Sequence, residues 1–155
     1  RSANLPQTME RILSGKCLNA GQVCIAPDYL MVPEESLDEV ISLAQSVVGQ
    51  MYPTMIDNPQ YTAVINQRHH ERLSGYIADA EHRGLQVIPL NPADESFDTS
   101  STRKMPLTLI INPDEEATCM QEEMFGRLET DQLACNFIKV EIGRHRRSIG
   151  FLIRD

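Results

Sequence analysis

The chain opens with apolar residues at the three-to-four-residue spacing of one helical face: Leu5, Met9, Ile12 and Leu13. Pro6 suits the first turn of such a helix, which is predicted to run to Gly15 or slightly beyond. The polar residues 18–24 then indicate a turn, and the apolar residues 29–32 indicate a strand. Cys24 is therefore expected between a helix and a strand.

Two further stretches carry a helical period, residues 37–48 and residues 73–80. The first follows Ser36 and Glu39, whose spacing is that of a capping box, so a capped helix start is predicted there. The second is expected to end at Gly84, because glycine readily takes the left-handed conformation that terminates a helix.

Short apolar runs at residues 85–90 and 107–111 predict strands, and the polar residues 91–104 between them predict an exposed loop. Helices and strands therefore alternate, which favours an α/β layer structure with a largely parallel sheet flanked by helices. Residues 133–142 and 149–153 could make further strands near the C-terminus.

Composition narrows the class of protein. The chain has 155 residues, 41% of them hydrophobic, with no apolar run of the roughly 18 residues that a membrane span requires, so no membrane segment is expected. The net charge of −8 argues against nucleic acid as a partner, and the basic residues 144–147 are read as a solvated charge run. The N-terminus lacks the apolar segment of a signal peptide, which predicts a cytoplasmic location.

Cysteines and histidines show no metal pattern. Cys17, Cys24, Cys119 and Cys135 are widely spaced without a CxxC pair, so free thiols are expected. His69 and His70 are adjacent and are predicted to point to different sides of a helix, and no HExxH sequence is present. We therefore expect no metal site.

Cys24 is the strongest candidate for a reactive side chain. It follows a turn containing Gly21, where exposed backbone amides could stabilise a thiolate or an oxyanion. On this pattern alone the choice stays open, since a lone cysteine is more often a small buried apolar residue than a nucleophile.

Two motifs carry a family resemblance. Asn19-x-Gly21-Gln22-x-Cys24 resembles the nucleophile signature of aldehyde dehydrogenases, and residues 15–33 look most like the branch that contains coniferyl aldehyde dehydrogenases. Residues 105–126, which end in the sequence QEEMFG, resemble the family segment that ends in EEIFGP. The resemblance implies that residues 1–126 are a partial catalytic domain with a truncated three-layer α/β fold. Cys17 stands where the family has an aromatic or aliphatic residue, and it is read as core packing.

The resemblance implies roles for three residues. The Cys24 thiolate would attack an aldehyde, its backbone amide would help to hold the oxyanion, hydride would pass to NAD or NADP, and water would hydrolyse the resulting thioester. Glu123 would bind the hydroxyls of the nicotinamide-side ribose, and Phe125 would pack beside the nicotinamide. Without the resemblance, Glu123 reads as a solvated side chain and Phe125 as a core residue.

The chain also departs from the family pattern. Only 23 residues precede Cys24, where family members carry a dinucleotide-binding domain, and nothing there, Glu10 included, matches the general base. After Gly126 the family continues with proline, whereas residues 127–155 show no likeness, which suggests a truncation, frameshift or fusion whose tail adds a strand or strands at an exposed sheet edge.

Two functions are expected from these patterns. The first is an aldehyde dehydrogenase fragment that oxidises an aldehyde to a carboxylate through Cys24, inactive alone and dependent on a complementing chain or a homo-oligomer. The second is a non-catalytic oligomerising or interaction module that keeps only the fold.

Overall fold

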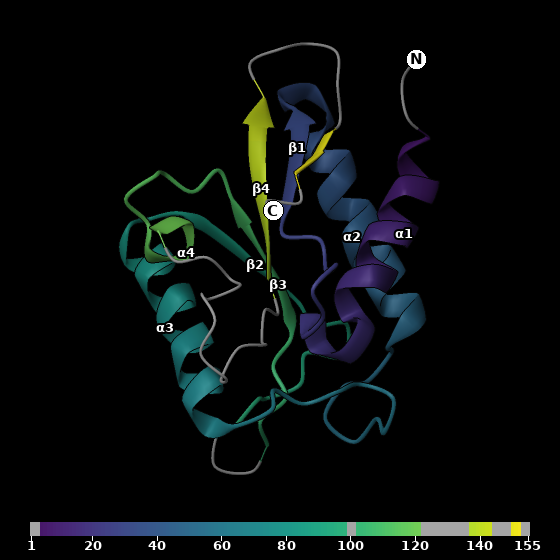
Figure 1. Ribbon diagram of the computed structural model, residues 1–155. Coiled ribbons are helices and arrows are strands. Elements are labelled where there is room, and N and C mark those ends of the chain that lie inside the picture. Colours follow the sequence, from purple (N-terminus) through teal and green to yellow (C-terminus); the bar gives the residue numbers. More distant parts are fainter. Residues whose placement is uncertain (1–3, 99–101, 122–136, 144–149, 153–155) are drawn as a thin grey trace.

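The computed structural model describes residues 4–98, 102–121, 137–143 and 150–152, which form a single five-stranded sheet with helices on both faces (Figure 1). Its helices are α1 (Leu5–Cys17), α2 (Leu37–Met51), α3 (Gln67–His82) and the short α4 (Thr118–Gln121). Its strands are β1 (Tyr29–Pro33), β2 (Gln86–Leu90), β3 (Leu107–Ile111), β4 (Phe137–Gly143) and β5 (Gly150–Leu152).

The sheet has a parallel centre and antiparallel margins. Its strand order is β2-β3-β4-β1-β5, in which β3, β4 and β1 run parallel while β2 and β5 run antiparallel to their neighbours. All five residues of β3 are buried, as expected for a strand covered on both faces. The predicted α/β fold with helices on both sides of the sheet is confirmed.

Alternate residues of β3 face two separate cores. Leu109 and Ile111 belong to the larger core, beneath α1 and α2. Ile110 belongs to a smaller core beneath α3. Since successive side chains of a strand point to opposite faces, this division establishes three layers, helix over sheet over helix.

Strand β4 does not lie where the sequence predicted the C-terminal strands. It pairs with β3 on one side and β1 on the other, so it is an interior strand, and of the two C-terminal strands only β5 lies at an edge of the sheet. Ile138, Lys139 and Val140 are all buried, which fits a strand covered on both faces rather than one added at a margin.

The predicted capping box at Ser36 is wrong, although α2 does begin at the next residue. Ser36 makes no side-chain capping bond, and its φ of −102° and ψ of −2° are helical because it is the last residue of the 3₁₀ turn Glu34–Ser36. A capping side chain reaches the following amides from an extended backbone, which Ser36 does not have.

The N-caps of α1 and α3 are both asparagines. The Asn4 side chain accepts from the Gln7 amide at 3.1 Å, and the Asn66 side chain accepts from the His69 amide at 2.9 Å. Helix α3 ends before Gly84, whose φ of +74° confirms the predicted terminator. In the described part of the chain, no helix is long and apolar enough to cross a membrane.

Candidate functional site

The segment that carries Cys24 begins with a strained backbone. After α1 the chain passes through the turn Leu18–Gly21, in which Asn19, Ala20 and Gly21 have φ values of 51°, 56° and 72°. Glycine adopts this region freely and asparagine does so often, but alanine does so at a cost of roughly 1–2 kcal/mol. Such strain persists only where the surroundings fix it, and it concentrates at functional sites, so the loop is the first candidate.

Cys24 is exposed on the loop that follows α1, residues 18–28, which is called the Cys24 loop below. It lies in a turn closed by a 3.0 Å hydrogen bond from the Ala26 amide to the Val23 carbonyl. Among the residues described, the large apolar side chains that face solvent are Leu18, Ile25 and Ile65, with exposed fractions of 58%, 69% and 61%. The first two belong to this loop, and the backbone of the third is hydrogen bonded to Gln22, so the loop that carries the exposed Cys24 also presents apolar side chains to solvent.

The other described thiols are buried. Burial raises the pKa of Cys17 to about 12, although the nearby Lys16 opposes the shift, and burial also raises the pKa of Cys119. Because the thiolate is the nucleophilic form, neither residue competes with Cys24 near neutral pH. The prediction that Cys17 packs in the core is confirmed, and Cys135 lies outside the described residues.

The buried amide of Gln22 ties the Cys24 loop to a second segment. Its Nε2 donates to the Asn19 carbonyl at 2.7 Å and to the Ala63 carbonyl at 3.3 Å, and its Oε1 accepts from the Ile65 amide at 2.9 Å. The Asn19 side chain in turn donates to the Gln22 carbonyl at 3.3 Å. The motif residue two positions before Cys24 therefore fixes both the strained turn and its neighbour.

That neighbour, residues 61–65, is itself fixed to the chain leading into β3. The Tyr61 hydroxyl donates to the Met105 carbonyl at 2.9 Å and accepts from the Leu107 amide at 3.0 Å. The Val64 amide donates to the Arg103 carbonyl at 3.0 Å, and Arg103 Nε donates to the Val64 carbonyl at 3.1 Å. The Cys24 loop is thereby connected to the central sheet through the 61–65 segment.

A buried charge cluster lies just after the loop, at the start of β1. Lys16 Nζ lies 3.4 Å from Asp28 Oδ1, and Lys139 Nζ lies 3.6 Å from Asp28 Oδ2 and donates to the Tyr29 hydroxyl at 2.9 Å. Burial lowers the pKa of Lys16 to about 8, and Asp28 opposes that shift. The carboxylate therefore joins the last turn of α1 to the central strand β4.

Sequence reasoning missed the structural roles of Gln22, Lys16 and Asp28. Gln22 was visible only as part of a motif, and no local pattern indicates which distant backbone groups an amide will meet. The predicted residues Glu123 and Phe125 lie outside the described residues, as do residues 144–147, so their roles stay predictions. The described histidines, cysteines and carboxylates form no group that could hold a metal ion.

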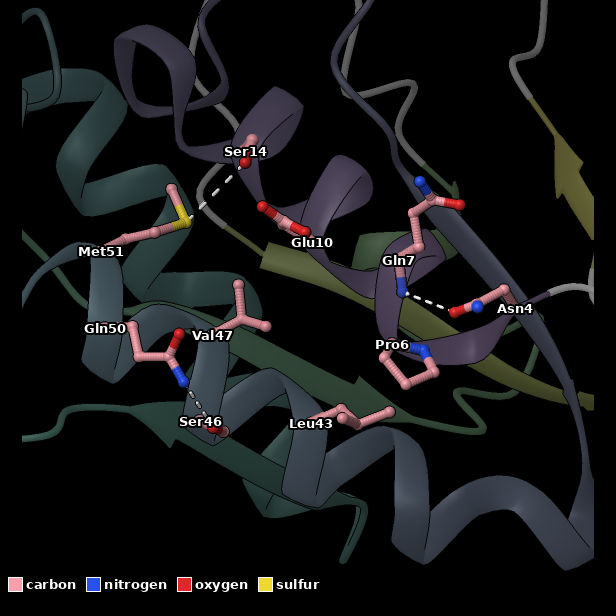
Figure 2. Close-up of a pocket in the computed structure, with 10 residues that line it drawn as sticks. All are labelled: Asn4, Pro6, Gln7, Glu10, Ser14, Leu43, Ser46, Val47, Gln50 and Met51. Atoms are coloured by element: carbon pink, nitrogen blue, oxygen red, sulfur yellow. Dashed lines mark hydrogen bonds between the residues drawn. The ribbon is translucent and has the colours of Figure 1, made fainter.

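A groove lies between α1 and α2 (Figure 2). Its described lining comes from the two helices and the residue that caps α1, and Glu10 is the charged side chain among those described residues. Across the groove Ser14 donates to the sulfur of Met51 at 3.9 Å. No residue between 18 and 28 lines it, so the groove adds nothing to the chemistry of Cys24.

Comparison with known proteins agrees with this geometry. The pattern of the aldehyde dehydrogenase family matches residues 1–128. A coniferyl aldehyde dehydrogenase of Pseudomonas sp. is 46% identical over 128 residues, which are 83% of this chain and 27% of that protein.

Solved structures share the fold. The substrate-bound AldH of Staphylococcus aureus superposes with a TM-score of 0.74 at 26% identity, over 94% of this chain and 28% of that one. Aldehyde dehydrogenase AldC of Pseudomonas syringae, in complex with NAD⁺ and octanal, gives a TM-score of 0.68 at 18% identity, over 92% of this chain and 28% of that one.

The extent of these matches differs between sequence and fold. The sequence match ends at residue 128, whereas a fold match over 94% of the chain must extend past that residue. The chain spans about a quarter of the length of the relatives it matches. The three-layer fold, the strained loop with its exposed cysteine and the match over residues 1–128 lead to one conclusion: this chain belongs to the aldehyde dehydrogenase family.

Proposed function

We propose that this chain carries the nucleophile of an NAD(P)-dependent aldehyde oxidation and that Cys24 is the attacking residue. The observation that carries the proposal is an exposed thiol on a strained, hydrogen-bonded loop at the motif position that family resemblance assigns to the nucleophile. Family membership supports the reaction class, and the buried state of Cys17 and Cys119 supports the choice of cysteine.

The chain's own contribution is nucleophilic attack and charge stabilisation. The Cys24 thiolate forms a bond to the aldehyde carbon, and the electron pair of the carbonyl moves to its oxygen, where the Cys24 backbone amide can donate. A bound nicotinamide would accept the hydride. Glu123 and Phe125, which resemblance assigns to that cofactor, stay part of the proposal because they lie outside the described residues.

The remaining catalytic groups come from outside these 155 residues. The matched relatives extend well beyond the region that this chain covers, and family resemblance assigns the general base and the cofactor domain to that remainder. We therefore propose that further sequence of the same protein, or a complementing chain, supplies these groups for turnover. A homo-oligomer is also a proposed assembly, but copies of these residues alone would not supply them. Aromatic aldehydes are the proposed substrates because the Pseudomonas relative is a coniferyl aldehyde dehydrogenase. A cytoplasmic location completes the proposal, together with a family domain that starts in residues 1–126 and takes its interior strand β4 from the residues 127–155 that the sequence suggested as a tail.

The exposed apolar side chains favour one alternative. An apolar surface suits a contact with another protein as well as the wall of a substrate pocket, and here it consists of Leu18, Ile25 and Ile65. The alternative is a non-catalytic module that oligomerises through this surface. The two functions differ in whether Cys24 is required.

An oxidation assay distinguishes them. The chain is mixed with an aromatic or an aliphatic aldehyde and NAD or NADP, alone and with the part of the Pseudomonas relative that lies outside the matched region, while reduced nicotinamide is followed by absorbance. We expect turnover only in the mixture, and none when the chain carries Cys24→Ser. Turnover that survives Cys24→Ser would reject Cys24 as the nucleophile, and self-association without turnover in any mixture would favour the module.

A further inference from the structure

We infer that Gln22 is a positioning residue for Cys24, acting through the 61–65 segment and Arg103. The inference rests on the proposed function of Cys24 as nucleophile, but its geometry is independent of the substrate. Gln22 precedes Cys24 by two residues, and only 6% of its surface is exposed.

Both the oxygen and the nitrogen of the Gln22 side-chain amide are hydrogen bonded. Its oxygen accepts from the Ile65 amide, and its nitrogen donates to the carbonyls of Asn19 and Ala63. A glutamine amide offers two donors and an acceptor on one side chain, and both kinds of group are satisfied here. A hydrocarbon side chain of the same length would fill the space but make none of these bonds.

The segment that receives Gln22 is a fixed reference. Val64 is buried in the core beneath α3, and its amide and carbonyl are both bonded to Arg103. The Tyr61 hydroxyl bridges Met105 and Leu107 at the start of β3. Because the 61–65 segment cannot shift without breaking these bonds, Gln22 places the Cys24 loop relative to the central sheet.

Position matters at this loop because Gln22 lies close to the reactive residue in the chain. Val23 alone separates Gln22 from Cys24, and the turn itself is closed by one backbone hydrogen bond, from Ala26 to Val23. A nucleophile must approach a carbonyl in a narrow geometry, and the amides that stabilise the oxyanion must be placed in advance. Loosening Gln22 should therefore impair attack on a carbonyl without blocking access to the sulfur.

Glu95 provides a matched control elsewhere in the fold. Its carboxylate accepts from the Met55 and Ile56 amides at 2.6 Å and 3.1 Å, so Glu95→Ala also removes a side chain that fixes loop backbone. None of the hydrogen bonds of Glu95 involves the Cys24 loop or the 61–65 segment. Glu95→Ala thus shows what a loss of stability alone does to the measurements, and any further change in a Gln22 variant reports a loss of positioning.

The first measurement reports on position and needs no substrate. A nitroxide spin label is attached to Cys24 in the full chain carrying Cys135→Ser, and its mobility is read from the electron paramagnetic resonance line shape. We expect Gln22→Met to mobilise the label and Glu95→Ala to leave it unchanged. Equal mobility in the Gln22→Met and parent proteins overturns the inference.

The second measurement uses Gln22→Glu as the conservative variant. A protonated glutamic acid can both donate and accept, whereas the carboxylate only accepts and would face the carbonyls of Asn19 and Ala63. Because a protonated carboxyl has a single donor, it can keep the bond from the Ile65 amide and one of the two bonds to the carbonyls. The label in Gln22→Glu should therefore come closest to the parent's mobility at acid pH and become more mobile as the pH rises. A label that is equally mobile at every pH would contradict a hydrogen-bonded positioning role.

The third measurement compares two reactions of the same thiol. Acylation of Cys24 by p-nitrophenyl acetate develops a carbonyl oxyanion, whereas alkylation by iodoacetamide does not. We expect Gln22→Met to slow acylation by about tenfold to a hundredfold, the scale of a misplaced catalytic group, with a much smaller change in alkylation. An unchanged ratio of the two rates would contradict positioning. A parent chain that acylates no faster than free cysteine would instead reject the proposed function, and the label mobility would still decide the role of Gln22.

Discussion

Helix α2 and the Cys24 loop are maintained by different forces. Helix α2 buries Val40, Ala44 and Val48 against the main core and stays in place through apolar contact along one face. The loop exposes its large apolar side chains and depends on the amide of Gln22, which binds Asn19 within the loop and also Ala63 and Ile65, more than forty residues away. Burial therefore defines the frame, while a few directional bonds define where the reactive thiol lies.

The largest effect on chemistry should come from the thiol itself. Cys24→Ser should reduce acylation by p-nitrophenyl acetate by roughly a thousandfold or more, the scale of removing a nucleophile, because a serine hydroxyl is far less ionised near neutral pH. Thermal unfolding should be unchanged, since Cys24 is exposed. Rapid acylation of the serine variant would show that another group is the nucleophile.

The largest effect on stability should come from the apolar frame. Leu13 is a residue of α1 that is fully buried in the main core, so Leu13→Ala should lower the free energy of unfolding by about 2–5 kcal/mol. Denaturant titration measures the loss. Acylation of Cys24, measured where the variant is still folded, should stay close to that of the parent, and a matching loss of acylation would mean that the frame and the loop are not separable.

Gln22→Met should combine a smaller loss of stability with a clear loss of chemistry. Leaving the Ile65 amide and its carbonyl neighbours without this partner should cost about 1–3 kcal/mol in denaturant titration. Acylation should fall more than it does in Leu13→Ala, although the protein is more stable than that variant. Slower acylation in Leu13→Ala than in Gln22→Met would contradict the separation of the apolar frame from the loop.

The buried charge cluster predicts a dependence of stability on pH. The pKa of Lys16 is about 8 in the folded chain and 10.5 as its ordinary value, so above pH 8 the unfolded chain holds more protons than the folded one. Stability should therefore rise between about pH 8 and 9. Above pH 9 the raised pKa of Cys17 acts in the opposite direction, because the unfolded thiol ionises first. Lys16→Met should abolish the rise, as measured by denaturant titration at each pH, and a rise that persists would reject Lys16 as its origin.

The smallest effects should separate the two kinds of helix cap. Ser36→Ala should change the free energy of unfolding little, because Ser36 makes no capping bond. Asn66→Ala should cost about 1 kcal/mol, since Asn66 accepts from the His69 amide at the start of α3. Equal losses of unfolding free energy in the two variants would show that Ser36 caps α2 after all, against the structure.

The apolar pattern predicted most of the frame. The runs at residues 29–32, 85–90 and 107–111 correspond to β1, β2 and β3, because short apolar runs bounded by turn residues are typical of strands. The interior position of β4 was not predictable, since strand order depends on contacts between residues far apart in the sequence. The capping box failed for a related reason: Ser36 belongs to the 3₁₀ turn Glu34–Ser36 and so lacks the extended backbone that a cap requires.

The candidate site was predicted only in part. Cys24 was identified by its motif, and its exposure on a Gly-containing turn agrees with that choice. The bonds of Gln22 to residues 63 and 65, and the meeting of Lys16 with Asp28 and Lys139, join segments whose sequences give no sign of each other. Directional polar contacts of this kind arise from the fold and not from local pattern.

The most direct test compares the folded chain with its own loop. The rate of acylation by p-nitrophenyl acetate is measured for the parent protein and for a peptide of residues 18–30, which carries the same thiol and neighbours without the 61–65 segment. If the fold positions Cys24 for attack on a carbonyl, the protein should acylate faster than the peptide, while iodoacetamide alkylates both at similar rates. Equal acylation of protein and peptide would contradict the claim that this fold prepares Cys24 as a nucleophile.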